Sequence, residues 1–494
     1  MSAPSTDNSR VEAEASAHSS TRDVDWQDFR EHLATADKDG NRRWLHPKKP
    51  HGRWYQRRTL LSWAMLAVMF IGPFVRIDGN PLLMMNIVER RFSILGQIFW
   101  PEDAIIFAVA MLTFLGGIMI FTTAFGRLWC GWTCPQTVLM EMVFRKLEYA
   151  IEGDAAEQRA LAASPWNPRK IRIKLFKQGV FFGISFLIAN TLLSYIIGSD
   201  ALIRIITDDP RNHSVGLGFM LLFTLVFYAI FARFREQACT FICPYGRFQS
   251  ALLDENTMVV AYDSKRGESR APWKKGQTIE LRKSEGHGDC VNCRQCVAVC
   301  PTGIDIRDGV QMECVNCTAC IDACDAVMDK VGRPRGLVRY ASLNGIQHGQ
   351  PLRYTARMKL YTGVLLCLVT LFLGLVLTRH QVETLLLRAP GALFQSAGEG
   401  KISNLYTIKV INKSNHDLPI RLQLEAPAGE IRLMGGNMVV PKNQLSQSSV
   451  LVALPKASIK GSNTPLKIGV YSGDKRLETV KTIFVGPRED QDSQ

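Results

Sequence analysis

Eight cysteines in one short stretch constrain this chain more than any other feature. They form two copies of the pattern C-x2-C-x2-C-x3-C, which read CVNCRQCVAVC and CVNCTACIDAC. This is the spacing of bacterial two-cluster ferredoxins, in which the fourth cysteine of each run binds the other cluster. The spacing therefore predicts two [4Fe–4S] clusters. Their expected ligands are Cys290, Cys293, Cys296 and Cys324 for the first, and Cys314, Cys317, Cys320 and Cys300 for the second.

Two other kinds of cysteine site fit this spacing less well. Zinc sites usually pair two C-x2-C hooks across a longer gap, and disulfide frameworks belong to small secreted domains. The chain has 494 residues and 13 cysteines, with none after Cys367. This distribution indicates that the cysteine-rich part lies in a reducing compartment.

Five apolar runs are each close to the ~20 residues that a transmembrane helix needs. They lie at 59–77, 104–125, 179–198, 215–234 and 360–378. Nine Lys and Arg fall between 126 and 178, whereas 78–103 and 199–214 hold two each. By the positive-inside rule, the N-terminus and the cysteine region are cytoplasmic, and everything after about residue 379 is periplasmic. We therefore expect a multi-pass protein of the bacterial inner membrane. We attribute the net charge of +14 to Lys and Arg that set the membrane orientation, not to nucleic-acid binding.

The C-terminal part has a different pattern. Short alternating runs such as NLYTIKVIN and PLKIGVYS are separated by Gly, Pro, Asn and Ser, which predicts about seven strands in an immunoglobulin-like sandwich. The fold class is thus a five-span α-helical bundle with an inserted two-cluster ferredoxin domain and an all-β C-terminal domain. The expected order is a disordered tail over 1–40, a four-span domain over 41–254, the ferredoxin domain over 255–358, the fifth helix over 359–379 and the sandwich over 385–490.

A second cysteine motif ends the second and fourth spans. The sequences FGRLWCGWTCPQ and FREQACTFICPY share a Phe five residues before a C-x3-C-P, and we call residues 125–135 and 234–244 the first and second membrane motifs. The spacing of four predicts that both thiols of a pair share one helix face, and the proline shapes the backbone that follows. We predict a redox or copper site, which could bind Cu(I), cycle between dithiol and disulfide, or form a third electron-transfer site. Its residues are Cys130, Cys134, Cys239 and Cys243.

The remaining cysteine and the missing motifs narrow the chemistry further. Cys367 lies alone in the last apolar run, and we expect it to be buried in the protein core. The sequence contains no C-x-x-C-H motif, which would indicate a c-type haem. It also contains no P-loop or Rossmann motif, which would indicate a nucleotide.

Taken together, these features resemble the cytochrome c oxidase accessory protein family (CcoG, also called FixG or RdxA). The stretch CDAVMDKVGRPRGLVRYASLNG after the last ferredoxin cysteines is similar to a specific segment of that family. The resemblance covers residues 40–490. It implies cluster binding by the eight ferredoxin cysteines and an oxidoreductase that converts Cu(II) to Cu(I) for assembly of the cbb-type oxidase. The implied partners are copper ions or copper-delivery proteins, oxidase assembly factors and an electron donor.

Two other functions fit the same features. NapH-like membrane ferredoxins also combine doubled C-x3-C-P with two clusters, which suggests a quinol-oxidising relay to a respiratory reductase. The predicted β domain instead suggests a scaffold that binds oxidase subunits without redox chemistry.

Overall fold

The computed structural model describes Thr35 and residues 42–486, except 78, 88–90, 95, 275, 352, 390–393, 397, 399 and 460. The tail expected over 1–40 therefore lies, apart from Thr35, outside the described residues. The chain divides into two compact units, which we call unit 1 (Met1–Pro73 with Ala110–Val369) and unit 2 (Phe74–Val109 with Thr370–Gln494).

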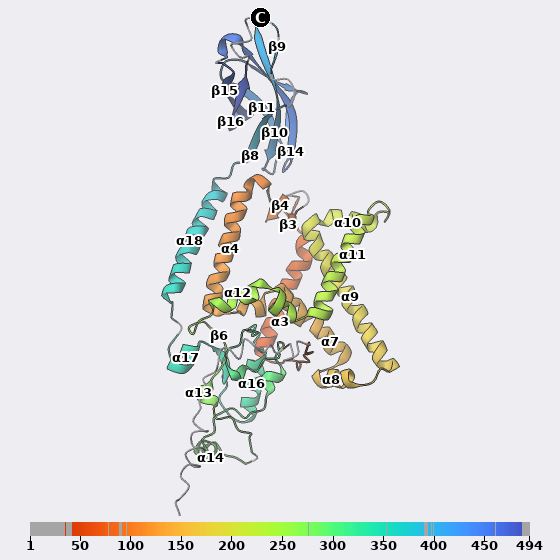
Figure 1. The fold of residues 1–494 in the computed structure, drawn as a ribbon, viewed down its shortest axis with the longest axis vertical. Coiled ribbons are helices and arrows are strands. Elements are labelled where there is room, and N and C mark those ends of the chain that lie inside the picture. The colour runs from red at the N-terminus through yellow and green to blue at the C-terminus, as the bar shows by residue number, and fades with distance from the viewer. Residues whose placement is uncertain are drawn as a thin grey trace, which may run out of the picture. The chain divides into compact units, whose positions relative to one another are not determined.

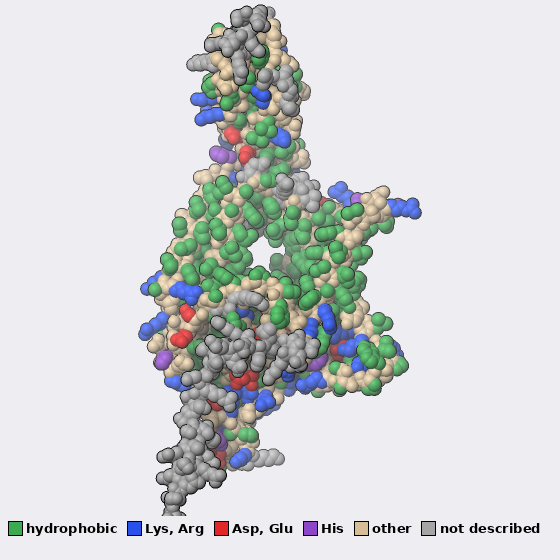
Figure 2. All heavy atoms as spheres, viewed as in Figure 1, with side chains coloured by type: hydrophobic (Ala, Val, Ile, Leu, Met, Phe, Trp, Pro, Cys, Tyr) green, Lys and Arg blue, Asp and Glu red, His purple; other side chains and the backbone are tan. Residues whose placement is uncertain are grey.

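Four helices are long and apolar enough to cross a membrane: α4 (Ala104–Phe125), α9 (Pro168–Ile197), α11 (Ser214–Ala229) with its π-helical continuation η4 (Ile230–Phe234), and α18 (Ala356–Leu377). In unit 1, α9 and α11 lie side by side (Figure 1). Hydrophobic side chains cover the outward faces of these helices in Figure 2. This is the surface expected of helices whose solvent is lipid. The helical membrane part of the predicted fold class is confirmed.

The first apolar run gives a different helix from the one expected over 59–77. Helix α3 spans Arg53–Ile71 and is followed by a 3₁₀ turn that contains Pro73. It begins early because Asp322, far along the chain, accepts hydrogen bonds from the backbone N–H groups of Trp54 (3.2 Å) and Tyr55 (2.8 Å). Its first turns are rich in arginine, so α3 is not among the four helices that qualify by length and composition.

Short helices connect the long ones in unit 1. They are α5 (Leu128–Trp132), α6 (Pro135–Val138), η3 (Leu139–Phe144), α7 (Arg145–Glu152), α8 (Ala155–Ala163), α10 (Ser199–Thr207), η5 (Ala238–Ile242) and α12 (Pro244–Leu252). The segments η3, η4 and η5 are π-helical. Such segments are rare and occur frequently at functional sites; here all three adjoin the membrane motifs.

The cysteine-rich part of unit 1 is built around a two-stranded antiparallel sheet. Strand β6 (Val259–Tyr262) pairs with β7 (Val338–Ala341). Between these strands come α13 (Ser264–Gly267), α14 (Ile279–Ser284), α15 (Gln295–Ala298), η6 (Ile306–Asp308) and α16 (Ala319–Lys330), and α17 (Leu343–His348) follows β7. Their core contains Val260, Ile321, Met328 and Leu337, together with several of the cysteines.

Unit 2 contains the predicted immunoglobulin-like sandwich, drawn in blue in Figure 1. One sheet has the order β12-β14-β10-β8 with β9 paired to β10, and the other has the order β13-β11-β15-β16. The strands are β8 (Val382–Arg388), β9 (Gln395–Ser396), β10 (Lys401–Asn412), β11 (Leu418–Ala426), β12 (Glu430–Met434), β13 (Met438–Val440), β14 (Leu445–Pro455), β15 (Asn463–Ser472) and β16 (Lys475–Val485). Tyr406, Val452, Ile468 and Phe484 fill the core between the sheets, so this part of the fold class is confirmed.

Two small sheets in unit 2 were not predicted. Strand β1 (Arg76–Ile77) pairs with β2 (Asn80–Pro81), and β3 (Leu83–Asn86), β4 (Arg91–Ile94) and β5 (Gln97–Phe99) form a second sheet. The next turn holds Asp103, a buried carboxylate that lies 2.7 Å from both Arg379 Nη2 and Lys413 Nζ. This ion triad joins the first turn before α4 to the base of the sandwich.

Candidate redox site

The two ferredoxin loops, residues 290–296 (the first loop) and 314–320 (the second loop), share an uncommon backbone. In each loop the residues on both sides of the middle cysteine have positive φ: Asn292 (53°) and Arg294 (54°) in the first, Asn316 (53°) and Thr318 (67°) in the second. Non-glycine residues rarely adopt this conformation. Its repetition at equivalent positions indicates that both loops are shaped for the same task.

The eight cysteines fall into two spatial groups. Cys324 interacts electrostatically with Cys296, Cys290 and Cys293, whereas Cys320 interacts most strongly with Cys317, Cys314 and Cys300. The structure thus brings together the two sets that the spacing predicts. A small cavity is lined by Cys296, Cys300, Cys314, Cys317 and Cys320. Burial raises the pKa of Cys296, Cys314 and Cys324 to about 12, because a buried thiolate without a partner is poorly solvated.

Two groups of four soft donors suit iron–sulfur clusters. Among the described residues, no three His, Cys, Asp or Glu side chains converge closely enough to bind one metal ion. The ferredoxin cysteines, too, do not converge on one point. Such spacing is compatible with a cluster, because each thiolate of a cubane binds a different iron.

The surroundings of the two loops differ. Cys293 of the first loop is exposed, and Asn292 accepts a hydrogen bond from Arg307 at 2.7 Å. Asn316 of the second loop is buried, and its side chain accepts from the backbone N–H of Val260 at 3.2 Å. The carbonyl of Asn316 also accepts from Trp132 Nε1 (3.3 Å) and from the Tyr340 hydroxyl (3.1 Å).

The second loop is in direct contact with the first membrane motif. A β-carbon on Gly131 would lie 2.2 Å from the carbonyl oxygen of Val315, so only glycine allows the two backbones to approach this closely. Arg58 of α3 donates to the Gly131 carbonyl at 2.6 Å. The side chain of Cys130 packs against a buried group that includes Val315 and Cys317. One thiol of the membrane motifs therefore packs against the buried group that contains a predicted cluster ligand.

The two membrane motifs have the same local backbone. Gly126 and Arg235, each just after the shared phenylalanine, have positive φ of 58° and 52°. The backbone N–H of Cys134 donates to Trp129 and that of Cys243 to Ala238, both at 2.9 Å and both five residues back. The internal repeat predicted from the sequence is thus present in the structure.

The prediction that each thiol pair shares one helix face is wrong. Cys134 and Cys243 adopt non-helical backbone and are the N-caps of α6 and α12, which begin at Pro135 and Pro244. Proline disfavours helical conformation in the residue before it and is well tolerated at the first helical position. The helix therefore breaks at the second cysteine of each motif.

The motifs instead meet each other through crossed contacts. Cys130 of the first motif donates to Gln249 Oε1 on α12 at 3.2 Å, and Cys239 of the second motif shares a hydrogen bond with Thr137 on α6. Cys239 also interacts electrostatically with Cys134, Cys130 and Cys243, and burial together with these neighbours raises its pKa to about 12. All four thiols therefore lie close enough to influence one another electrostatically.

A buried arginine that the sequence analysis did not single out lies at this site. Arg127 is 8% exposed and donates to the carbonyl of Gly246. Burial lowers the pKa of Arg127, and the groups that oppose this are Cys130, Cys314, Cys239 and Cys243. The guanidinium thus lies between the membrane cysteines and the second loop. The sequence feature that could have pointed to Arg127 is its position three residues before Cys130, inside the first membrane motif.

An ion-pair network supports the site. Arg235 forms two hydrogen bonds with Glu148, at 2.7 and 2.5 Å, and Lys177 lies 2.7 Å from the same carboxylate. Burial raises the pKa of Glu148, but these cations outweigh burial and lower it to about 2. The fully buried Arg145 contacts Glu141 at 3.0 Å and Glu236 at 3.5 Å. These contacts fix the segments on either side of the second motif.

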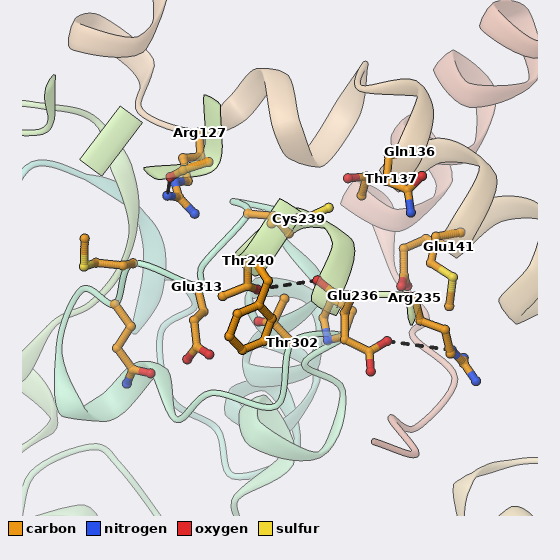
Figure 3. A pocket seen from close by; sticks show the side chains of 17 residues that line it. Arg127, Gln136, Thr137, Glu141, Arg235, Glu236, Cys239, Thr240, Thr302 and Glu313 are labelled. Carbon is orange, nitrogen blue, oxygen red and sulfur yellow. Dashed lines mark hydrogen bonds and ion pairs between the residues drawn. The ribbon is translucent and has the colours of Figure 1, made fainter. Parts of the chain in front are cut away.

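A cavity of about 400 Å³ opens beside Cys239. Figure 3 shows Arg127, Cys239 and Thr137 along one wall, with the sulfur of Cys239 directed toward Thr137. The lining includes the carboxylates and thioethers of Glu141, Glu236, Glu313, Met140 and Met312.

Cys367 differs from the other cysteines and from its prediction. It is exposed on α18 rather than buried in the protein core. The reason is that no residue in the apolar window of α18 is buried inside the protein. The apolar surroundings of this thiol are those of a lipid-facing helix surface.

Comparison with known proteins defines the class of this chain. A model described as a 4Fe–4S dicluster domain matches residues 234–343, and a 4Fe–4S binding domain matches residues 107–151. The Ig-like fold at the C-terminus of FixG matches residues 372–487. With its apolar helices, the chain is a membrane iron–sulfur protein of the electron-transfer class.

Three relatives identify the family. The chain is 32% identical over 467 residues to the nitrogen fixation protein FixG of Rhizobium meliloti, covering 84% of this chain and 87% of the relative. It is 33% identical to RdxA and 32% identical to RdxB of Cereibacter sphaeroides, each over 85% of this chain and 90% of the relative. The chain belongs to the FixG/RdxA family. A crystal structure of a FixG-related protein from Vibrio parahaemolyticus matches 22% of this chain and 99% of its own length, at 17% identity and a TM-score of 0.19.

Proposed function

We propose that this protein passes single electrons through two [4Fe–4S] clusters to Cu(II), and that the Cu(I) formed serves assembly of a cbb-type oxidase. Clusters exchange one electron at a time, and reduction of Cu(II) requires one. The observation that carries the proposal is the backbone contact of Gly131 with Val315. It joins a cluster-binding loop to a site with four thiols.

The cluster ligands in this proposal are the two groups of cysteines described above: Cys290, Cys293, Cys296 and Cys324, and Cys314, Cys317, Cys320 and Cys300. The clusters supply the electron-transfer chemistry when bound. The protein's own residues hold the loops in shape, Arg307 through Asn292 and Trp132 with Tyr340 through Asn316.

The proposed setting is the bacterial inner membrane. Five spans, including α3, would place the N-terminus and the ferredoxin part in the cytoplasm and the sandwich in the periplasm. The Lys and Arg of the 126–178 connection support this orientation. In Figure 2, Lys and Arg side chains gather around α7, α8 and α16.

The cavity beside Cys239 supports copper as the substrate. Carboxylate oxygens suit Cu(II) and thioethers suit Cu(I), and the cavity wall offers both, for example Glu313 and Met312. A copper ion in this cavity would lie beside the thiols at the end of the relay.

The test is copper reduction by the purified, cluster-loaded protein in detergent under anaerobic conditions. With dithionite as reductant, removed before addition of Cu(II), we expect Cu(I) to appear on a cuprous chelator in proportion to the reduced clusters. The variant C290S/C314S should give no Cu(I) and should not support oxidase assembly, whereas C367S should behave as wild type. Reduction no faster than in C290S/C314S would refute the reductase, and oxidase assembly without clusters would favour a scaffold.

A further inference from the structure

We infer that Cys130, Cys134, Cys239 and Cys243 together bind a third iron–sulfur cluster of the [4Fe–4S] type. This site is distinct from the two ferredoxin clusters. The inference does not depend on copper being the substrate.

The first argument is the arrangement of the ligands. Two motifs with the same backbone face each other, and each sends a contact from its first cysteine to the helix that follows the other motif, Cys130 to Gln249 and Cys239 to Thr137. Four thiols contributed in pairs by two segments can each bind one iron of a cubane.

The second argument is a set of buried donors without acceptors. The Nε of Arg127 and the Nε2 of Gln136 are buried and have no hydrogen-bond partner among the described residues. The Arg127 side chain as a whole is only 8% exposed. Buried donors without acceptors are unfavourable. A cluster with four thiolates carries net negative charge and presents sulfur acceptors, so it would balance the buried cation and accept hydrogen bonds from the unpaired donors.

The third argument comes from the family models. Residues 107–151, which match a 4Fe–4S binding domain, contain two cysteines, Cys130 and Cys134. The dicluster model begins at residue 234, so its match includes Cys239 and Cys243 as well as the ferredoxin loops. The likeness to 4Fe–4S proteins therefore extends to both membrane motifs.

The site is placed to exchange electrons with the second ferredoxin cluster. Cys130 packs against the buried group that contains Cys317, and Arg127 interacts electrostatically with Cys314. With both clusters bound, Cys314, Cys317, Cys320 and Cys300 would hold the donor of a single electron and the four membrane cysteines would hold its acceptor, with no bond made or broken. The buried cation of Arg127 would stabilise the added negative charge at the membrane cysteines.

The experiment is iron and acid-labile sulfide analysis of the full-length protein, purified anaerobically in detergent. We expect about 12 iron atoms per chain in wild type, four for each of three clusters, and about eight in C134S/C243S. The matched control C367S alters a cysteine outside all three sites and should keep about 12. About eight iron atoms in wild type would overturn the inference, and so would copper in wild type that C134S/C243S loses without losing iron.

A second variant keeps every thiol and guards against misfolding. R127Q should retain about 12 iron atoms, while a redox titration followed by EPR shows one of three couples shifted to lower potential, because the reduced form has lost its cation. Three unshifted couples, or only two couples in wild type, would contradict the inference. Neither measurement depends on copper reduction, so a failed copper assay and a failed iron count are distinguishable.

Discussion

The two ferredoxin loops have the same sequence start, the same spacing and the same backbone, yet their surroundings differ. The first loop leaves Cys293 exposed, and its Asn292 is held by Arg307 from within the ferredoxin part. The second loop is buried and contacts the first membrane motif through Val315 and Asn316. The comparison teaches that one half of a symmetric pair is exposed to solvent, whereas the other packs against the first membrane motif. This difference between the loops is caused by residues that lie outside the repeated sequence.

The largest expected effect comes from breaking the contact that distinguishes the second loop. In G131A the added carbon would lie 2.2 Å from the Val315 carbonyl, and such overpacking costs about 1–3 kcal/mol, enough to displace the loop. We expect copper reduction to fall about tenfold or more, while EPR still shows the first cluster. G117A is the matched control, because nothing lies within 4 Å of its added carbon. Equal activity of the two variants would show that the contact is not the route of transfer.

A second test uses the accessibility of the first loop. Because Cys293 is exposed and the second loop is not, an iron chelator should remove the first cluster faster, by roughly tenfold under conditions of local opening. Iron release followed by absorbance should have two phases, and EPR after the first phase should show the second cluster. Release in a single phase would mean that the two loops open together.

A matched pair of asparagine substitutions compares the loops directly. N292A and N316A each replace an Asn at positive φ, so the backbone cost is about equal. N292A removes the hydrogen bond from Arg307, but this guanidinium keeps its two hydrogen bonds to Asp305. N316A instead leaves the buried N–H of Val260 without its acceptor, at a cost of about 1–3 kcal/mol. Its thermal unfolding midpoint in detergent should therefore drop further than that of N292A. A larger drop in the unfolding midpoint of N292A would contradict the conclusion that the second loop is the more deeply buried one.

The smallest effect is expected when one of the two hydrogen bonds to the Asn316 carbonyl is removed. W132F removes one hydrogen bond from the membrane motif, worth about 0.5–1.5 kcal/mol, and Y340F removes one from the ferredoxin strand β7. Both should lower stability slightly, but only W132F should slow copper reduction, by about two- to threefold. Stopped-flow oxidation of the reduced clusters by Cu(II) separates these outcomes, and equal slowing by Y340F would argue against a special role for the membrane contact.

Much of this fold could be predicted because its determinants are local in sequence. Ligand spacing gives the cysteine groups, unbroken apolar length gives α4 and α18, and alternation gives strands such as β10 and β11. The start of α3 could not be predicted, because its cap is Asp322, 267 and 268 residues away from the N–H groups it binds.

The candidate site was predicted in its cysteines but not in its geometry. The helix break at Cys134 follows from Pro135, and that effect on the preceding residue was available in the sequence. The role of Arg127 was not, because its partners are thiols from three separate segments. The exposure of Cys367 was missed for another reason: an apolar run does not reveal whether protein or lipid surrounds it.

The carbonyl of Asn316 also leads us to predict an order of events during biogenesis. It lies between Cys314 and Cys317, in backbone that an Asn adopts only at some cost, and it becomes the acceptor for Trp132 once the loop has its final shape. A loop of this kind takes that shape when its cysteines bind their cluster. Cluster insertion should therefore precede docking of the ferredoxin part onto the first membrane motif. In a chain without clusters, we expect the ferredoxin part to remain undocked from this motif.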